Sequence, residues 1–314
     1  MNNDLSKIHP QLRGIARVSP KFSFSRQNLW LVRRLISLIP ASKAPDLHIE
    51  NVLIPVENGA MTVRLRIYTP PSAPQPMPAL IWMHGGGYIM GIPEMDDRYC
   101  IELVRQVGMA VVSVDYRCAP SFPFPAGLDD CMAALEWAVS HAAQLGIDPT
   151  RIAIGGASAG GGLAAALVQQ AHDQLAIKPI LQQLVYPMLD DRTVLRAELD
   201  DSLNVTWDQQ SNRFGWESYL GRQVGAEDAP AYAVPARRED LAGLPPAWIG
   251  VGSLDIFHDE DVAYAQRLKT SGVTCELVLV PGGFHGFDVF NHQLPVVQDF
   301  RNSQIAALKK AFSV

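Results

Sequence analysis

The amino-acid sequence predicts an α/β fold in which helices flank a mostly parallel, doubly wound β-sheet. From about residue 50 to the C-terminus, short apolar or β-branched runs alternate with segments of helical periodicity, the pattern of consecutive strand–helix–strand units. Later runs such as Met109–Val114 and Ile152–Ile154 are apolar throughout, as expected of strands covered by helices on both sides. The 314 residues suffice for one large domain or a domain with an insertion.

The strand predictions rest on runs of β-branched and apolar residues bounded by turn residues. In the second run, Val63, Leu65 and Ile67 alternate with Arg64 and Arg66, which predicts a strand with one face in water. The eight predicted strands are Asn51–Val56, Thr62–Tyr68, Ala79–Met83, Ala110–Asp115, Arg151–Gly155, Ile180–Tyr186, Ala247–Gly252 and Thr274–Val280.

Helical periodicity fills the gaps between these strands, and Asp148-Pro149 and Pro281-Gly282-Gly283 punctuate the ends of elements. The five predicted helices are Asp97–Val107, Leu128–Leu145, Ala159–Gln174, Asp259–Thr270 and Gln298–Phe312.

Two regions outside this alternation are predicted to form a small helical cap over the carboxyl edge of the sheet. Residues 1–47 precede the first strand and have a helical pattern, and residues 190–222 are polar with aromatic residues at helical spacing. The catalytic domain is then expected to comprise residues 48–189 and 223–314. The aromatic residues of the second cap region, the first three of which are expected to line an apolar substrate pocket, are Trp207, Phe214, Trp216 and Tyr219.

The segment Leu29–Ile39 is apolar over most of a helical circumference and ends at Pro40. We expect a helix that covers another part of the protein, because its polar face is narrow. A helix that lies on a membrane surface is the alternative, since the segment combines Trp30 with two arginines.

Composition favours a globular enzyme without nucleic-acid or general membrane affinity. The chain is 48% hydrophobic and 18% charged, with a formal net charge of −6, which argues against binding nucleic acid or anionic membranes. Its four cysteines have no metal-site spacing, and no apolar stretch reaches 18 residues. Because the start also lacks a secretory signal pattern, we expect a cytoplasmic protein.

The strongest local motif is Gly156-Ala157-Ser158-Ala159-Gly160, placed between a predicted strand and a predicted helix. This G-x-S-x-G pattern in a strand–turn–helix context predicts a sharp turn that exposes a nucleophilic serine. Small residues two positions before and after Ser158 are needed because the turn is crowded. A turn that merely lets helix and strand pack closely is the alternative interpretation.

The same glycines also match a relaxed dinucleotide-binding fingerprint over Gly160–Ala165. We interpret this match as accidental, because its first glycine lies inside the predicted helix instead of in the turn before it. The fingerprint also occurs late in the chain, without an acidic residue at the end of a following strand.

A second motif, His84-Gly85-Gly86-Gly87, directly follows the predicted strand Ala79–Met83. Consecutive glycines leave main-chain N–H groups free to point at a developing oxyanion. The N–H groups of Gly85 and Gly86, with that of Ala159, are therefore predicted to form an oxyanion hole.

The base and acid of a catalytic triad are assigned by elimination, since they follow the serine in the order acid, then histidine. His172 lies 14 residues along the helix that begins after Ser158, which places it about 21 Å away. His292 lies in a polar stretch beyond the strands, and His258 lies at a helix entry. His285 remains, in a glycine-flanked loop after the last strand.

For the acid, Asp255 follows the strand Ala247–Gly252 at the same edge of the sheet. Its rivals Asp259, Glu260 and Asp261 begin a helix, where carboxylates usually cap the helix and balance its dipole. We therefore predict Asp255 as the residue that orients His285.

Taken together, these motifs resemble those of the bacterial hormone-sensitive-lipase-like carboxylesterases, a branch of the α/β hydrolases. They occur in the family's order from about residue 50 onward. The residues that carry the resemblance are His84-Gly85-Gly86-Gly87-Tyr88, Asp115-Tyr116-Arg117, Ala119-Pro120, Phe122-Pro123-Phe124-Pro125-Ala126, Gly156-Ala157-Ser158-Ala159-Gly160-Gly161, Asp255 with Asp259-Glu260, and His285-Gly286-Phe287.

The resemblance implies the α/β-hydrolase fold with an eight-stranded sheet, and cofactor-free hydrolysis of short to medium acyl esters through an acyl-enzyme. It implies that His84 supports the oxyanion loop, and that a homodimer forms through the last strand. The chain departs from the family at Ala157, where Asp is common, and at Cys118 and Ser121, where Leu and Glu are usual. These departures bear on acyl preference, loop rigidity and pH optimum.

Two other functions remain open from the sequence. A hydrolase of amides, lactones or peptides would share every catalytic feature. A non-catalytic small-molecule receptor would keep the fold, although such proteins usually lose a triad member and Ser158, Asp255 and His285 are all present.

Overall fold

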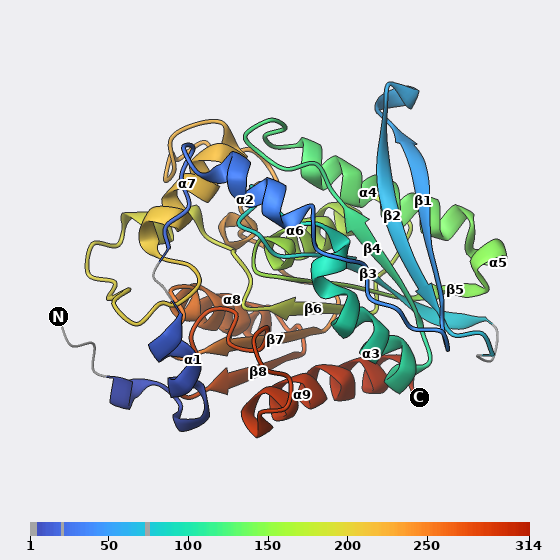
Figure 1. The fold of residues 1–314 in the computed structure, drawn as a ribbon. Helices are drawn as coiled ribbons and strands as arrows, with labels where there is room; N and C mark the ends of the chain where they lie inside the picture. Colours follow the sequence, from blue (N-terminus) through green and yellow to red (C-terminus); the bar gives the residue numbers. More distant parts are fainter. Residues whose placement is uncertain (1–4, 20–21, 73–75) are drawn as a thin grey trace.

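The computed structural model describes residues 5–19, 22–72 and 76–314. An eight-stranded sheet with the order β1-β2-β4-β3-β5-β6-β7-β8 forms its centre (Figure 1). β2 is antiparallel to both of its neighbours, and the other six strands, β3 to β8, all run parallel to one another. The strands are β1 (His48–Val56), β2 (Met61–Thr69), β3 (Met77–Met83), β4 (Ala110–Asp115), β5 (Ile147–Ala157), β6 (Leu181–Val185), β7 (Ala247–Gly252) and β8 (Cys275–Val280).

All eight predicted strands are present; β4 and β7 have the predicted ends, and the other six differ at one or both ends. The largest shift is in β5, which begins at Ile147 and not at the predicted Arg151. Ile147 pairs with Met77, and the next aligned pair is Ala79 with Ile152. The residues between them, which include the Asp148-Pro149 turn, bulge out of register and keep the early pairing possible.

Nine α-helices are assigned in the described residues. They are α1 (Arg13–Val18), α2 (Leu29–Ile36), α3 (Asp97–Val107), α4 (Ala126–Ser140), α5 (Ala142–Leu145), α6 (Ala159–Gln174), α7 (Gln209–Leu220), α8 (His258–Thr270) and α9 (Pro295–Phe312). Short 3₁₀ turns, η1 to η6, cover Leu5–Lys7, Pro10–Leu12, Glu57–Gly59, Pro93–Asp96, Asp191–Leu195 and Pro235–Arg237.

Two helix predictions need correction. The predicted helix Leu128–Leu145 is broken at His141, which separates α4 from α5. The His141 ring stacks on Trp137 with centroids 4.5 Å apart, and its Nδ1 lies 2.9 Å from the Trp137 carbonyl oxygen. Residues 1–47 also contain less helix than expected, because only α1, α2 and two 3₁₀ turns are helical among the described part of this region.

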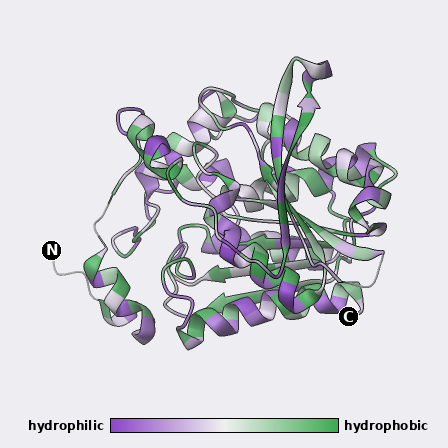
Figure 2. Cartoon of the chain, turned by 45° about the vertical axis from the view of Figure 1, so that its right-hand side comes forward, coloured by the Kyte–Doolittle hydropathy of each residue, from purple (hydrophilic) through white to green (hydrophobic). Residues whose placement is uncertain are grey.

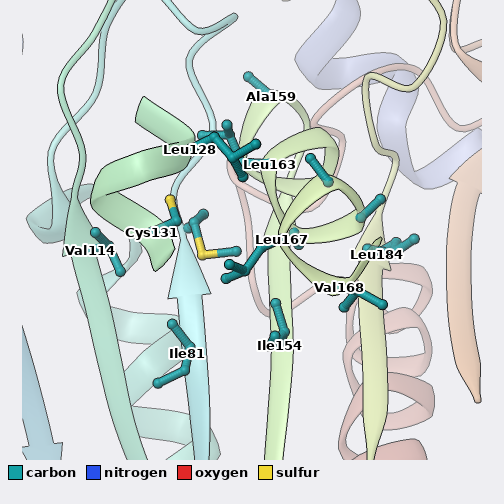
Figure 3. Packing of buried hydrophobic residues seen from close by; sticks show 14 of the residues in the cluster. Ile81, Val114, Leu128, Cys131, Ile154, Ala159, Leu163, Leu167, Val168 and Leu184 are labelled. Carbon is teal, nitrogen blue, oxygen red and sulfur yellow. The ribbon is translucent and has the colours of Figure 1, made fainter. Parts of the chain in front are cut away.

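The apolar core has two layers, one on each face of the sheet. On one face α4, α6 and α8 pack against the strands, and Figure 3 shows side chains of α6 meeting those of β3, β5 and β6. On the other face α3 and α9 contribute, together with residues of η1 and η2. In Figure 2 the central strands are mostly hydrophobic, whereas α9 along the lower edge shows bands of both colours.

The prediction that one face of β2 lies in water is wrong for the second half of the strand, although Thr62 is exposed and Arg64 is partly exposed. Arg66 is buried, and its guanidinium binds Asp97 of α3 with an Nε–Oδ1 distance of 2.7 Å. The Tyr68 hydroxyl and the Ser42 N–H donate to the same carboxylate, each at 2.6 Å. The start of α3 and the segment before β1 therefore cover this face, and the charge of Arg66 is neutralised inside the protein.

None of the helices in the described residues combines the length and the apolar character that a bilayer crossing requires.

Candidate active site

Ser158 lies at the sharp turn between β5 and α6. Its backbone has φ 56° and ψ −119°, a combination that a non-glycine residue adopts only when its surroundings enforce it. Three main-chain hydrogen bonds do so: the Ser158 N–H donates to Val185 at 2.9 Å, and its carbonyl oxygen accepts from Gly162 and Met188 at 3.0 Å. The strained turn points the side chain away from the sheet.

The two flanking glycines are required by crowding. A Cβ at Gly156 would lie 2.3 Å from the Gly160 carbonyl oxygen. A Cβ at Gly160 would lie 2.1 Å from the carbonyl oxygen of Met83 and 2.4 Å from that of His84. Both contacts are with backbone atoms, which cannot move aside as a flexible side chain could.

The structure brings Ser158, His285 and Asp255 together. The Oγ of Ser158 lies 2.8 Å from Nε2 of His285, and Nδ1 of His285 lies 2.7 Å from Oδ2 of Asp255. A carboxylate only accepts hydrogen bonds, so Nδ1 carries the proton that is donated to Asp255. Nε2 is then left with a lone pair that accepts the Ser158 hydroxyl proton.

The three side chains are buried and held by their surroundings. Asp255 accepts a second hydrogen bond from the Phe257 N–H at 3.0 Å. The His285 ring makes T-shaped contacts with Tyr186 and Phe257, with centroids 4.8 and 5.0 Å away. Thr206 of the region between β6 and α7 donates from Oγ1 to the His285 carbonyl oxygen at 2.6 Å. His285 is therefore held in place by contacts of its ring and by a hydrogen bond to its backbone carbonyl oxygen.

The glycine loop after β3 lies directly beside the serine. A Cβ at Gly85 would lie 3.6 Å from the Ser158 Cβ. Gly86 has φ +126°, where a side chain would be strained and would meet the Met90 carbonyl oxygen at 2.0 Å. Among the described residues, no acceptor is bound by the N–H groups of Gly85, Gly86 and Ala159. Unpaired N–H groups are rare in a protein interior, so these three are available to a ligand atom near Ser158.

His84 lies under this loop. Its Nδ1 is 2.8 Å from the Gly85 carbonyl oxygen, and its ring stacks on Tyr116 with centroids 4.3 Å apart. The Tyr116 hydroxyl donates to the His84 carbonyl oxygen at 2.8 Å. Burial lowers the pKa of His84, so the ring is neutral and donates from Nδ1 to Gly85. These contacts hold the first glycine of the loop in place.

Two of the three rival acids of α8 have other partners, whereas both carboxylate oxygens of the third, Asp261, are buried without a hydrogen-bond partner among the described residues. Asp259 pairs with Arg196 at 2.8 Å, and His258 binds the same carboxylate through Nδ1 at 2.8 Å. Glu260 is buried and accepts from the N–H groups of Leu189 and Asp190 at 2.7 and 3.1 Å. Glu260 thus connects α8 to the segment that follows β6.

The predicted pocket aromatics lie in different places. The benzene end of Trp207 packs on the glycine loop after β3, where a Cβ at Gly87 would lie 2.0 Å from it. Phe214 is half-buried and packs against the core. Trp216 has no exposed surface and contacts Tyr88, with ring centroids 5.1 Å apart. The prediction that Trp216 lines a substrate pocket is therefore wrong, because this side chain packs inside the protein. Trp207 precedes α7 instead of lying on it.

Two further residues that contact the site are not evident from the sequence. Phe24 packs against Trp207 with ring centroids 5.3 Å apart, and its N–H donates to Ser211 of α7 at 2.8 Å. Thr206 holds the His285 loop through its hydroxyl. Neither residue belongs to a motif, and only the contact of distant segments reveals them.

The segment Gly160–Ala165, which matches the dinucleotide-binding fingerprint, leaves no room for a ligand. Gly161 faces Pro187, and a Cβ at Gly162 would lie 2.1 Å from the Tyr88 hydroxyl oxygen. Within the described ranges, no group of three or more His, Cys, Asp or Glu residues has the geometry of a metal site.

This fold and this arrangement of serine, histidine and aspartate are typical of serine hydrolases, and comparisons with known proteins identify the family as one of ester hydrolases. A family model described as the alpha/beta hydrolase fold matches residues 80–289. The chain belongs to the hormone-sensitive-lipase-like carboxylesterases of the α/β-hydrolase superfamily.

Curated relatives and solved structures agree with this family. The chain is 35% identical to carboxylesterase NlhH of Mycobacterium tuberculosis over 277 residues, 87% of this chain and 85% of the relative. It is 33% identical to an ethyl acetate hydrolase of Pseudomonas putida over 230 residues, 72% and 71% of the two chains. Among solved structures, a bacterial heroin esterase superposes with a TM-score of 0.91 at 34% identity, covering 99% of each chain.

Proposed function

We propose that the protein hydrolyses esters of short to medium acyl chains, with Ser158 as nucleophile, His285 as base and Asp255 as the residue that orients the base. The continuous hydrogen-bonded chain from Asp255 through His285 to Ser158, beside three unpaired N–H groups, carries this proposal.

In the first half-reaction, Ser158 Oγ attacks the ester carbonyl carbon while its proton passes to Nε2 of His285. The carbonyl oxygen becomes an oxyanion that accepts from the N–H groups of Gly85, Gly86 and Ala159. When the intermediate collapses, the C–O bond to the alcohol breaks and the departing oxygen takes the proton from Nε2. Asp255 stabilises the imidazolium that exists between the two proton transfers.

In the second half-reaction, water attacks the acyl carbon and gives a proton to Nε2 of His285. Collapse of this second intermediate breaks the bond to Ser158 Oγ, which regains a proton from Nε2. The carboxylic acid is released and the enzyme returns to its starting state. No electron transfer and no cofactor enter these steps.

The proposed preference for short to medium acyl chains is based on the segments that cover the site. We propose that residues 1–47 and 190–222 act as its cap, because Phe24 and Trp207 pack against each other and Trp207 lies on the glycine loop after β3. Aromatic side chains packed over the site in this way would limit the length of the acyl group that fits. The ethyl acetate hydrolase among the relatives, named for an ester of a two-carbon acid, is consistent with this preference.

Replacing Ser158 by Ala tests the proposal. We expect loss of nearly all turnover of p-nitrophenyl butyrate, because no nucleophile remains, and loss of labelling by a fluorophosphonate probe. Peptide mapping of the labelled wild-type protein should place the probe on Ser158. Full activity of the variant, or a probe attached elsewhere, would contradict the assignment.

Substrate comparison tests the finer parts. Across p-nitrophenyl esters from acetate to palmitate, kcat/KM should be highest for short to medium chains. If matched amides or lactones are turned over faster than esters, an amidase or lactonase replaces the ester assignment on the same triad. Absence of both turnover and probe labelling in the wild-type protein would instead indicate a receptor.

A homodimer through β8 is also proposed. β8 pairs with β7 on one side only and has no other strand partner among the described residues. An open strand edge is a common surface for pairing between copies. The molecular mass in solution tests this assembly.

A further inference from the structure

Helix α2 carries apolar side chains on both of its faces. Leu29 is buried, and Val32 and Ile36 pack against the core, which confirms that this helix covers another part of the protein. Because successive residues of a helix are about 100° apart, Trp30 and Leu35 emerge on the opposite side. Trp30 is 68% exposed and Leu35 is 59% exposed.

The exposed apolar strip continues beyond the end of the helix. Leu38 and Ile39 are exposed, and their N–H groups are bound to carbonyl oxygens of the last helical turn. This stretch of ten residues holds five of the fifteen large hydrophobic side chains that are exposed in the described part of the chain. Concentrated apolar surface of this kind marks an interaction site. We define the α2 patch as Trp30, Leu31, Leu35, Leu38 and Ile39.

Positive charge surrounds the α2 patch. Residues 22–45 contain four basic residues and no Asp or Glu, although the whole chain has a net charge of −6. Arg26, Arg34 and Lys43 are exposed, and none of them has a carboxylate partner among the described residues. Asp46, the next acidic residue along the chain, is paired with Arg105 at 2.6 Å. A surface that meets the α2 patch therefore faces cations without carboxylate partners, and salt screens their charge only beyond about 8–10 Å.

We propose that the α2 patch docks the enzyme reversibly on an anionic lipid surface. Trp, Leu and Ile side chains enter the boundary between headgroups and acyl chains, while the flanking Arg and Lys residues contact negative headgroups. A second copy of this chain is a poorer occupant. In a two-fold dimer each patch would face its own copy, so Arg34 of one protomer would approach the same cation of its partner.

The inner face of α2 connects this docking to the active site. Arg33 points inward and donates to the carbonyl oxygens of Ile89 at 2.8 Å and Ala119 at 2.5 Å. Ile89 follows the oxyanion glycines by only a few residues. Docking through α2 would therefore hold the catalytic edge of the sheet near the lipid surface, where apolar esters concentrate (Figure 1). The binding itself does not depend on the proposed hydrolysis.

Sedimentation with sucrose-loaded vesicles tests the proposal on the purified full chain. One vesicle set contains three parts phosphatidylcholine to one part phosphatidylglycerol, and the other contains phosphatidylcholine alone. We expect binding to the anionic set that weakens with added salt. The double variant Trp30→Ser/Leu35→Ser should lower the partition coefficient about 10-fold or more, and Arg34→Gln should lower it on anionic vesicles only.

A matched control is Leu53→Ser/Leu195→Ser, which removes two apolar side chains of similar exposure elsewhere on the surface. It should bind vesicles like the wild type. Turnover of a soluble p-nitrophenyl ester by all variants verifies that they are folded. The proposal is overturned if the wild type does not bind anionic vesicles, or if both double variants bind equally well. A dimer that only Trp30→Ser/Leu35→Ser abolishes, seen by sedimentation velocity without lipid, would assign the patch to a second copy instead.

Discussion

Single atoms decide whether the turn at Ser158 can form. The Cα of Gly160 lies so close to the strand β3 that a methyl group there would meet two carbonyl oxygens, those of Met83 and His84. The motif predicts small residues at these positions, but it does not name what crowds them. The structure identifies the neighbour as the end of β3 and the start of the glycine loop that follows it.

Gly160→Ala should therefore move the serine and the oxyanion loop apart. A new Cβ 2.1 Å from the Met83 carbonyl oxygen forces a backbone shift, and a displacement of about 1 Å can lower turnover roughly 100-fold. Steady-state kinetics on p-nitrophenyl butyrate measures this loss. Gly14→Ala is the control, because a Cβ added there would meet no atom within 4 Å; its activity should equal that of the wild type.

The residues of the site differ in how far the sequence reveals them. Ser158, Asp255 and His285 each follow a strand within a motif, so the order of elements places them at one edge of the sheet. Phe24 and Thr206 have no such signal, because their contacts depend on how the cap folds back. Trp216 misled the prediction, since aromatic residues at helical spacing are equally typical of a pocket and of a core.

At the scale of elements, β2 shows why alternation alone cannot locate solvent. Its arginines alternate with apolar residues as in an exposed strand, yet Arg66 is enclosed with Asp97 of α3. The acidic partner lies 31 residues further along the chain. A pattern within one strand does not contain that information, whereas the strand itself was predictable.

Arg66→Ala should destabilise the fold strongly. The change leaves the buried Asp97 carboxylate without its cation, a situation that typically costs about 3–5 kcal/mol. Urea denaturation followed by circular dichroism measures the free energy of unfolding. Arg105→Ala, which removes the partner of Asp46 in an exposed ion pair, should leave the unfolding midpoint nearly unchanged. Equal effects of the two substitutions would show that the Arg66 pair is not special.

At the scale of the whole molecule, stability should depend on pH through Asp96. Burial raises the pKa of its carboxyl from the ordinary 3.8 to about 6, so the folded state binds the proton more tightly than the unfolded state. The favourable contribution is present below about pH 4 and is lost as the pH rises through 6.

Asp96→Asn should remove this dependence. At pH 8 the variant should be more stable than the wild type by about 1 kcal/mol, a value reduced from the full linkage because the residue is only half-buried. Near pH 4.5 the two proteins should differ much less. Urea titrations at both pH values measure the difference. A larger advantage of the variant in acid than in base would contradict a raised pKa at Asp96.

The direct contact of Gly160 with the end of β3 also has an evolutionary consequence. The proposed nucleophile and oxyanion donors lie at strand ends and a helix start that touch through main-chain atoms, so we expect few substitutions to be tolerated there. Phe24 and Trp207 belong to segments outside the sheet, where side chains can vary without disturbing that framework. We therefore expect relatives of this protein to vary more in the side chains that meet the substrate than in the framework that holds Ser158.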